Sequence, residues 1–387
     1  MLAGYWDLPW WCDLLVALAL THVTIAAVTI YLHRHQSHGA LELAELAAHF
    51  FRLWLWLTTG MITKEWVAIH RKHHAKVDTA DDPHSPVALG LNRVLWGGVF
   101  LYVRESHNHK TIERYGHGTP DDWLERHIYT PLHKFGILLM LVIDLALFGI
   151  TAGAVIWAVQ MVWIPFWAAG VINGIGHFWG YRNFACADAS RNILPIGLLI
   201  GGEELHNNHH AYPGSARLSV RRYEFDIGWL YIRTLAWLRQ ARVTRVAPRL
   251  RLTAPRPVVD GETLKAVLAL RYEVMASYLR SLRRVAGEEL ARLKLDLRAR
   301  RGAVGLLSGD AAALAAPERE RVRQLLALSP RLSAVCAMRG ELEALWARTT
   351  TNREQLLEQL RDWIARAEAS GIRQLQEFSL RLRRYAV

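Results

Sequence analysis

Nine histidines gathered in four short groups constrain the fold of this 387-residue chain more than any other feature. Each group lies at the end of an apolar segment or just past one. Imidazole is the most common metal-binding side chain, so this placement predicts a shared metal site at the edge of a hydrophobic body. The nine residues are His33, His38, His70, His73, His74, His177, His206, His209 and His210.

The spacing within the groups predicts that they act together. HRKHH (70–74) and HNNHH (206–210) each place histidines at i, i+3 and i+4, which share one face of a helix. His33 and His38 are five residues apart and converge only if the helix ends or loosens between them. A single first-row metal takes at most about six ligands, so nine converging imidazoles predict two metal ions.

Polar residues beside the groups are candidates for supporting roles. Carboxylates next to metal-binding histidines hold each ring in the tautomer that binds metal. Asn173 lies four residues before His177, on the same helical face, and is expected to hold a metal-bound water. The candidate carboxylates are Glu203, Glu204, Asp81 and Asp82.

Trp66, four residues before His70, is compatible both with the wall of a substrate tunnel and with ordinary core packing. A lone histidine is more often a hydrogen-bonded structural residue than a ligand. That interpretation is applied to the histidines outside the four groups, which are His22, His49, His84, His107, His109, His117, His127 and His133. His35 is also set aside, because a helix would turn it away from His33 and His38.

The apolar segments predict three membrane crossings. Residues 9–32 form one span, and residues 135–176 form a helical hairpin that turns near 149–153, with a kink expected at Pro165. No Lys or Arg precedes Arg34, so the positive-inside rule puts the N-terminus outside and the histidine groups at the cytoplasmic face. An integral membrane protein is expected.

The apolar stretch 41–62 admits two interpretations. As a span, it would separate His38 from His70 across the bilayer and bury Glu45 and Arg52 at a cost of a few kcal/mol each. An interfacial amphipathic helix avoids both problems and is preferred. Residues 228–240 are interpreted in the same way.

Composition changes after a proline-bearing stretch. We expect a membrane domain at 1–245, a linker at 246–258, and a basic amphipathic helical domain at 259–387. Lys and Arg exceed Asp and Glu by 47 − 35 = 12, with much of the excess in the last third. Because Arg and Glu are mixed along these helices, nucleic-acid binding is considered unlikely. The predicted fold class is all-α: a membrane bundle with interfacial helices, a histidine-rich cytoplasmic cap and a helical C-terminal domain.

These motifs resemble the membrane fatty-acyl desaturases. HRHQSH matches that family's HRxxxH box, and HRKHH and HNNHH match its two HxxHH boxes. NGIGHFWGYR (173–182) and GGEELHNNHHAYPGS (201–215) are similar to elements of the acyl-CoA Δ9 type. The resemblance covers about residues 15–240 and is greatest to a bacterial branch with a helical C-terminal extension. A faint likeness to a transposase segment is also visible in 353–372.

The resemblance implies a non-haem di-iron centre held by the nine histidines, with Asn173 contacting one metal through water. It implies an O2-dependent desaturase that introduces a cis double bond, expected at Δ9, into a saturated acyl chain. The carrier is expected to be coenzyme A or a phospholipid. No fused electron donor is recognisable, so a separate ferredoxin, cytochrome b5-like protein or flavoprotein reductase is expected. The alternative is a His-box lipid or alkane hydroxylase, which the NGIGH…GYR element disfavours.

Overall fold

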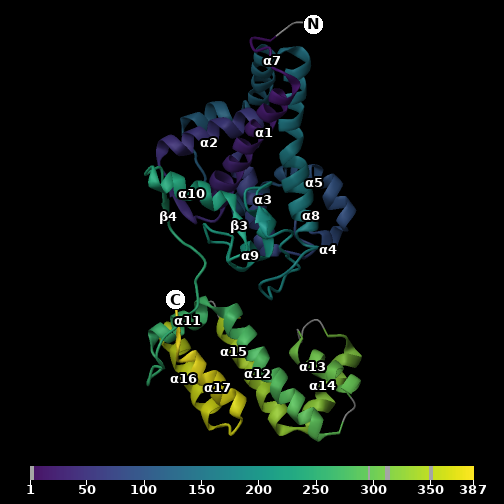
Figure 1. Cartoon of the computed structure of the whole chain (residues 1–387), viewed down its shortest axis with the longest axis vertical. Helices are drawn as coiled ribbons and strands as arrows, with labels where there is room; N and C mark the ends of the chain where they lie inside the picture. The colour runs from purple at the N-terminus through teal and green to yellow at the C-terminus, as the bar shows by residue number, and fades with distance from the viewer. Residues whose placement is uncertain (1–3, 295–296, 310–313, 348–351) are drawn as a thin grey trace. The chain divides into compact units, whose positions relative to one another are not determined.

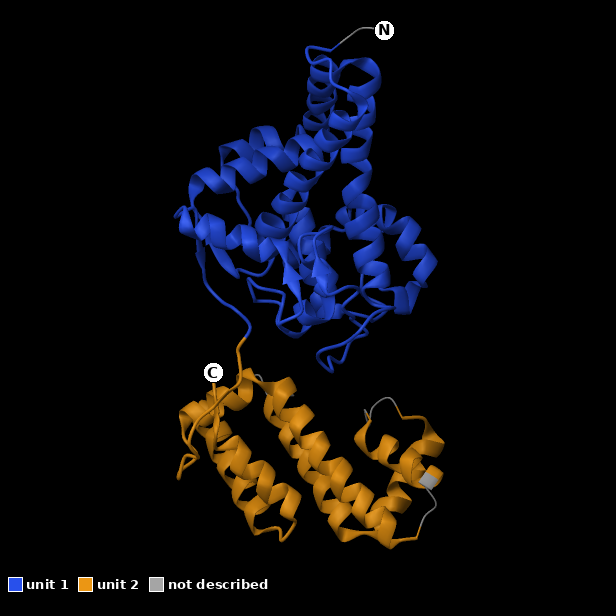
Figure 2. Cartoon of the chain, in the orientation of Figure 1, with its two compact units in different colours: residues 1–247 blue, residues 248–387 orange. Residues whose placement is uncertain are grey.

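The computed structural model describes residues 4–294, 297–309, 314–347 and 352–387. The chain divides into two compact units, residues 1–247 and 248–387 (Figure 2). Both are mostly helical (Figure 1). The all-α prediction missed three short strand pairs, β1–β4, β2–β3 and β5–β6. They are only two or three residues long, too short to produce an alternating apolar pattern.

The first unit contains the following elements in chain order: α1 Trp10–Ala27, the π-helix η1 Val28–Ser37, β1 Leu41–Leu43, α2 Glu45–Thr58, α3 Thr63–Lys76, α4 Pro86–Leu89, α5 Leu91–Ser106, α6 His109–Tyr115, the π-turn η2 Glu125–Tyr129, α7 His133–Ile164, the π-helix η3 Pro165–Ile172, α8 Asn173–Ile175, β2 Ile196–Gly197, the 3₁₀ turn η4 Glu203–Leu205, α9 His206–Ala211, β3 Phe225–Asp226, α10 Ile227–Trp237 and β4 Ala241–Val243.

Two helical runs are long and apolar enough to cross a membrane, Trp10–Ser37 and His133–Ile175. The second folds back on itself. Gly149 has φ 79°, a left-handed conformation that glycine adopts without steric cost, and it separates α7 into two arms. The arms lie side by side, since Trp157 Nε1 donates to the carbonyl of Ile137 at 3.1 Å. The predicted hairpin is thus present, and Pro165 begins π-helix η3 rather than a simple kink.

Helix α2 runs across the direction of α1 and α7 (Figure 1). At 14 residues it is about 21 Å long, shorter than the roughly 30 Å hydrocarbon layer. Its outer face carries exposed Leu46, Phe50 and Leu53. On its inner face Arg52 is buried and pairs with Asp122 at 2.6 Å. The length and direction of α2 are compatible with the interfacial helix that the sequence favours, which stays a prediction, and the buried Arg52 charge has a carboxylate partner.

Strand pairing joins distant parts of the first unit next to the histidine groups. β1 follows the first group directly and pairs antiparallel with β4. Arg34, inside that group, is fully buried and donates to Asp226 Oδ1 at 3.0 Å and to the carbonyls of Gly201 and Ala216. The end of the first span is therefore tied to the segment that carries the last histidine group.

The second unit is a helical domain with an apolar core that includes Tyr278, Trp363 and Phe378. Its two short strands pair residues 251–252 with 385–386, so most of the predicted linker 246–258 belongs to this unit. Its elements are β5 Arg251–Leu252, α11 Gly261–Ala269, α12 Arg271–Arg292, α13 Leu297–Ser308, α14 Ala316–Leu328, α15 Pro330–Ala347, α16 Arg353–Ala369, α17 Arg373–Leu382 and β6 Tyr385–Ala386.

Candidate metal centre

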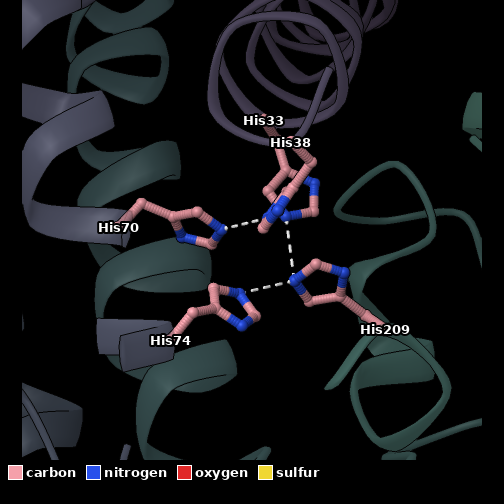
Figure 3. Close-up of side chains that lie close together, drawn as sticks. All are labelled: His33, His38, His70, His74 and His209. Carbon is pink, nitrogen blue, oxygen red and sulfur yellow. Dashed lines mark hydrogen bonds between the residues drawn. The ribbon is translucent and has the colours of Figure 1, made fainter. Parts of the chain in front are cut away.

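The nine histidines of the four groups come together in two adjacent clusters. In each cluster the candidate ligand atoms lie within 4.8 Å of one another. Cluster one, shown in Figure 3, contains His33, His38, His70, His74 and His209. Cluster two contains His73, His177, His206 and His210, all buried.

Local backbone geometry explains why each group converges. In a π-helix residues five apart are neighbours, and the amide of His38 donates to the carbonyl of His33 at the end of η1. This wide turn brings together two histidines that an α-helix would separate. On α3 and α9 the i, i+3, i+4 spacing brings all three histidines of each helix to the site, but each helix divides them between the two clusters.

The nitrogen spacing fits metal coordination. His38 Nε2 lies 2.8 Å from His70 Nε2, and His177 Nε2 lies 3.0 Å from His206 Nε2. Four further Nε2 pairs lie at 2.8 to 3.4 Å. With metal–nitrogen bonds of about 2.1 Å, neighbouring ligands of one ion are about 3 Å apart. Each cluster thus has the size of a coordination shell.

Carboxylates occupy the opposite nitrogen of four rings. The Nδ1 atoms of His73, His177 and His210 bond to carboxylates, and that of His33 lies 2.7 Å from Glu203. The partners are Asp82 at 3.0 Å, Asp78 at 3.1 Å and Asp188 at 3.3 Å. With the Nδ1 proton donated to a carboxylate, the rings of His73, His177 and His210 each present an Nε2 lone pair to the cluster. Several lone pairs facing one another repel unless a cation lies between them, so the donor set fits a metal in each cluster.

Burial keeps the imidazoles of His70, His73 and His209 neutral. Desolvation, together with the neighbouring His177, lowers the pKa of His73 to about 3. Desolvation likewise holds the pKa values of His70 and His209 well below the ordinary value, with the other rings of cluster one adding to the effect. Neutral imidazole is the metal-binding form, so the site is ready for metal at neutral pH.

The candidate supporting residues differ in position. Glu203 and Asp82 lie against ligand histidines, as just described. Glu204 instead accepts hydrogen bonds from the amides of residues 199, 200 and 202. Asp81 pairs with Lys76 at the surface. Asp78 and Asp188 were not singled out in the sequence, because they lie in irregular loops whose spacing gives no signal.

His84 was assigned a structural role by the sequence, yet it lies at the site. Its buried ring centroid is 4.5 Å from that of His73, and its amide donates to Asp82. His73, Asp82 and His84 form a third group with metal-ligand spacing. The feature of the sequence that could have indicated this position is DPH (82–84), which follows soon after HRKHH. His35 instead turns away, with its Nδ1 3.0 Å from the carbonyl of Leu41.

A cavity of about 260 Å³ begins at the clusters and has mainly apolar walls. His33, His70 and His206 line its near end, together with Asn173 and Trp66. Trp66 stacks on the His70 ring, with centroids 4.9 Å apart. Close packing of α5 on η3 shapes one side, because a Cβ on Gly98 would lie 2.2 Å from the carbonyl oxygen of Ala169. The site thus joins a pair of metal-binding clusters to a cavity suited to an apolar chain.

Comparison with known proteins gives two separate results. Residues 8–252 match the family model described as fatty acid desaturase. Residues 267–387 match a model described as transposase. The earlier interpretation of the second unit as a helical extension of the first family is therefore corrected, since this region has its own, unrelated likeness.

Relatives similar to the first unit include desaturases of different position and carrier. An sn-1 stearoyl-lipid 9-desaturase of Anabaena variabilis is 28% identical over 243 residues, 62% of this chain and 86% of the relative. Delta-9 acyl-lipid desaturase 1 of Arabidopsis thaliana is 29% identical over 236 residues, 58% and 72%. An icosanoyl-CoA 5-desaturase of Limnanthes douglasii is 30% identical over 237 residues, 59% and 63%.

Proposed function

Since the chain belongs to the fatty acid desaturase family, we propose that it introduces a cis double bond, at Δ9, into a saturated acyl chain with consumption of O2. The observation that carries this proposal is the pair of histidine clusters at the near end of an apolar cavity. Acyl-CoA or a phospholipid supplies the chain. The Δ9 position is favoured by the stearoyl-lipid and acyl-lipid relatives.

The nine histidines would hold two iron ions, five donors in cluster one and four in cluster two. When bound, the irons supply the redox chemistry with O2 by which two hydrogens leave adjacent methylenes and water forms. Asn173 fits a water-mediated contact, because it lines the cavity beside cluster two. Glu203 and Asp82 keep their histidines oriented, and Asp78 and Asp188 do the same for His177 and His210.

The cavity walls position the substrate and exclude water. An unreactive methylene reacts only if it is held against the oxidising centre, and water there would divert the reaction. Trp66 forms part of this wall, and its stacking on His70 fixes the tunnel surface relative to a proposed ligand. The electrons come from a separate donor, a ferredoxin, a cytochrome b5-like protein or a flavoprotein reductase.

We further infer three crossings, α1–η1 and the two arms of α7, with the N-terminus outside. All nine histidines then lie at the cytoplasmic face of a bacterial inner membrane. Reporter fusions at the N-terminus and in residues 107–122 test this arrangement. If both reporters were found on the cytoplasmic side, the proposed topology would be contradicted.

Expression in a host with a known reductase, followed by gas chromatography–mass spectrometry of its lipids, tests the activity. We expect new cis-monounsaturated acyl chains in the lipids of cells that express the unmodified protein. These chains should be absent from cells that express the His73→Ala variant. Hydroxylated chains would favour the lipid or alkane hydroxylase alternative. Unchanged lipids from protein with two irons per chain and a working donor would contradict both.

A second candidate function concerns residues 248–387. The transposase match favours nucleic-acid binding by this unit, and so does its charge, since 26 Lys and Arg against 16 Asp and Glu leave 26 − 16 = +10. A gel-shift assay of the full chain in detergent, compared with a chain ending at 247, tests it. Binding that weakens with salt and needs residues 248–387 would support this function. Equal, absent or salt-insensitive binding would contradict it.

A further inference from the structure

The walls of the acyl cavity follow three helical stripes that lead away from the histidines. On the returning arm of α7, η3 and α8, residues repeat about every four positions along one face. The longest stripe runs from Asn173 past Ala169 to Gln160, a second follows α1 and η1, and a third on α5 includes Gly98 and Tyr102. Thirteen residues separate Asn173 from Gln160, or about 20 Å of helix, so Gln160 lies at the far end.

Gln160 is fixed in place by the other arm of the hairpin. It is 1% exposed, and its Nε2 donates to Asp144 Oδ2 at 2.9 Å. Asp144 is equally buried. This hydrogen bond joins the two arms of α7 and holds the Gln160 side chain in one orientation.

Gln160 also has unmet hydrogen-bonding capacity. Its Oε1 is buried and has no partner among the residues that the structure describes, and the same is true of the Tyr102 hydroxyl. Tyr102 lines the same cavity, on α5, one turn along that helix from Gly98, which lies beside Ala169 of η3. By contrast, the hydroxyls of Thr58 and Thr59, which also line the cavity, bond to carbonyls of their own helix.

We propose that Gln160 is a specificity-determining residue that sets the longest acyl chain the enzyme accepts. This inference rests on the proposed desaturase function. A terminal methyl that reaches Gln160 would seal a buried amide oxygen against hydrocarbon, which is unfavourable because nothing replaces the missing hydrogen bond. Chains that end one or more methylenes short leave room for water at this oxygen and are accepted. Asp144 is a positioning residue that keeps the amide across the path.

The test measures the chain lengths of the monounsaturated products when cells receive saturated acids from myristic to arachidic. Gln160→Leu removes the amide but keeps most of the bulk of the side chain, and Gln160→Ala removes most of that bulk. One methylene in an apolar pocket is worth about tenfold or more in discrimination. Both variants should raise the ratio of long to short products by about tenfold, with Gln160→Ala accepting the longer limit.

Val162→Ala is the matched control, since Val162 lies on the same helix but is 62% exposed and outside the cavity lining. Its product ratio should equal that of the unmodified protein. Asp144→Leu, which frees the Gln160 side chain, should broaden the range of lengths without shifting iron content. If a Gln160 variant binds fewer than two irons per chain, Gln160→Asn is used in its place. This change shortens the side chain and should increase the longest acyl chain that is accepted.

The outcomes separate the two proposals. An unchanged length ratio in active, iron-loaded Gln160→Leu and Gln160→Ala would overturn the role of Gln160 while leaving desaturation intact. Absence of any unsaturated product from the unmodified protein would instead overturn the proposed function.

Discussion

The two units of this chain both have apolar cores but differ in the polar side chains that they bury. The first encloses six of the nine clustered histidines together with Asp82, Glu204 and Arg34. The second encloses Trp363, Tyr278, Phe378 and many aliphatic residues. Burying polar groups is unfavourable unless partners compensate, whereas burying apolar groups is favourable by itself. The buried polar groups of the first unit therefore indicate a use that outweighs their cost, whereas the interior of the second unit is mainly a structural core.

The largest effect should come from removing a single nitrogen donor from the buried histidine clusters of the first unit. His209→Ala removes a cluster-one nitrogen 3.1 Å from His33 Nε2. We expect the unsaturated product to fall by more than about a hundredfold, because changes in residues that merely support a ligand already cost 10–100-fold. Iron per chain, measured by plasma emission spectrometry, should fall below that of the unmodified protein. His35→Gln, in the same sequence group but outside the clusters, is the control and should keep both.

The converse change removes one large apolar side chain from the core of the second unit. Trp363→Ala should destabilise the second unit by about 3–5 kcal/mol, since it leaves a cavity and removes the hydrogen bond from Nε1 to the carbonyl of Met338. Limited proteolysis should then cut within 248–387. Desaturation and iron content should stay unchanged, and loss of either would mean that the two interiors depend on each other.

A smaller effect should follow from altering a carboxylate behind the clusters. Asp78 has φ 58°, a conformation that Asn also tolerates, so Asp78→Asn changes the charge without straining the backbone. Its hydrogen bond to His177 Nδ1 would weaken, and we expect a 10–100-fold loss of iron affinity. Competition with a chelator measures this. Asp81→Asn, at the surface, is the matched control, and equal affinity in both variants would remove the assigned role of Asp78.

The smallest effect concerns the ion pair between α2 and the loop after α6. Hydrogen bonds from Arg52 lower the pKa of Asp122 to about 2. A lowered pKa in the folded state stabilises the protein above the unfolded value of about 4, and this contribution is lost as pH falls toward 2. Asp122 is half exposed, so the effect should be at most about 1 kcal/mol. Melting temperatures of Asp122→Asn and the unmodified protein should differ at neutral pH and converge near pH 2. A difference independent of pH would contradict the ion-pair account.

How much of this the sequence predicts depends on periodicity. The i, i+3, i+4 groups, the long apolar runs and the amphipathic 41–62 stretch have helical spacing, so the helices that contain them were predictable from the sequence. Asp78, Asp188 and His84 approach the site from irregular loops, where contact depends on tertiary folding alone. The partner of Arg52 lies 70 residues away, and no local pattern indicates it. Likewise, the division of each HxxHH group between two clusters follows from the crossing of helices, not from spacing.

The π-helical turn Val28–Ser37 has a consequence for how this protein tolerates change in length. It accommodates one residue more per turn than an α-helix, and that surplus residue brings His38 beneath His33. Deleting one residue between these two histidines would let the segment relax to an ordinary α-helical turn with all nine imidazoles still encoded. The two histidines would then be four residues apart in the sequence. Their positions would shift relative to β1, whose register with β4 is fixed. Such a deletion should reduce activity more than many substitutions, because it would remove the wide backbone turn. No change of side chain can restore that backbone geometry.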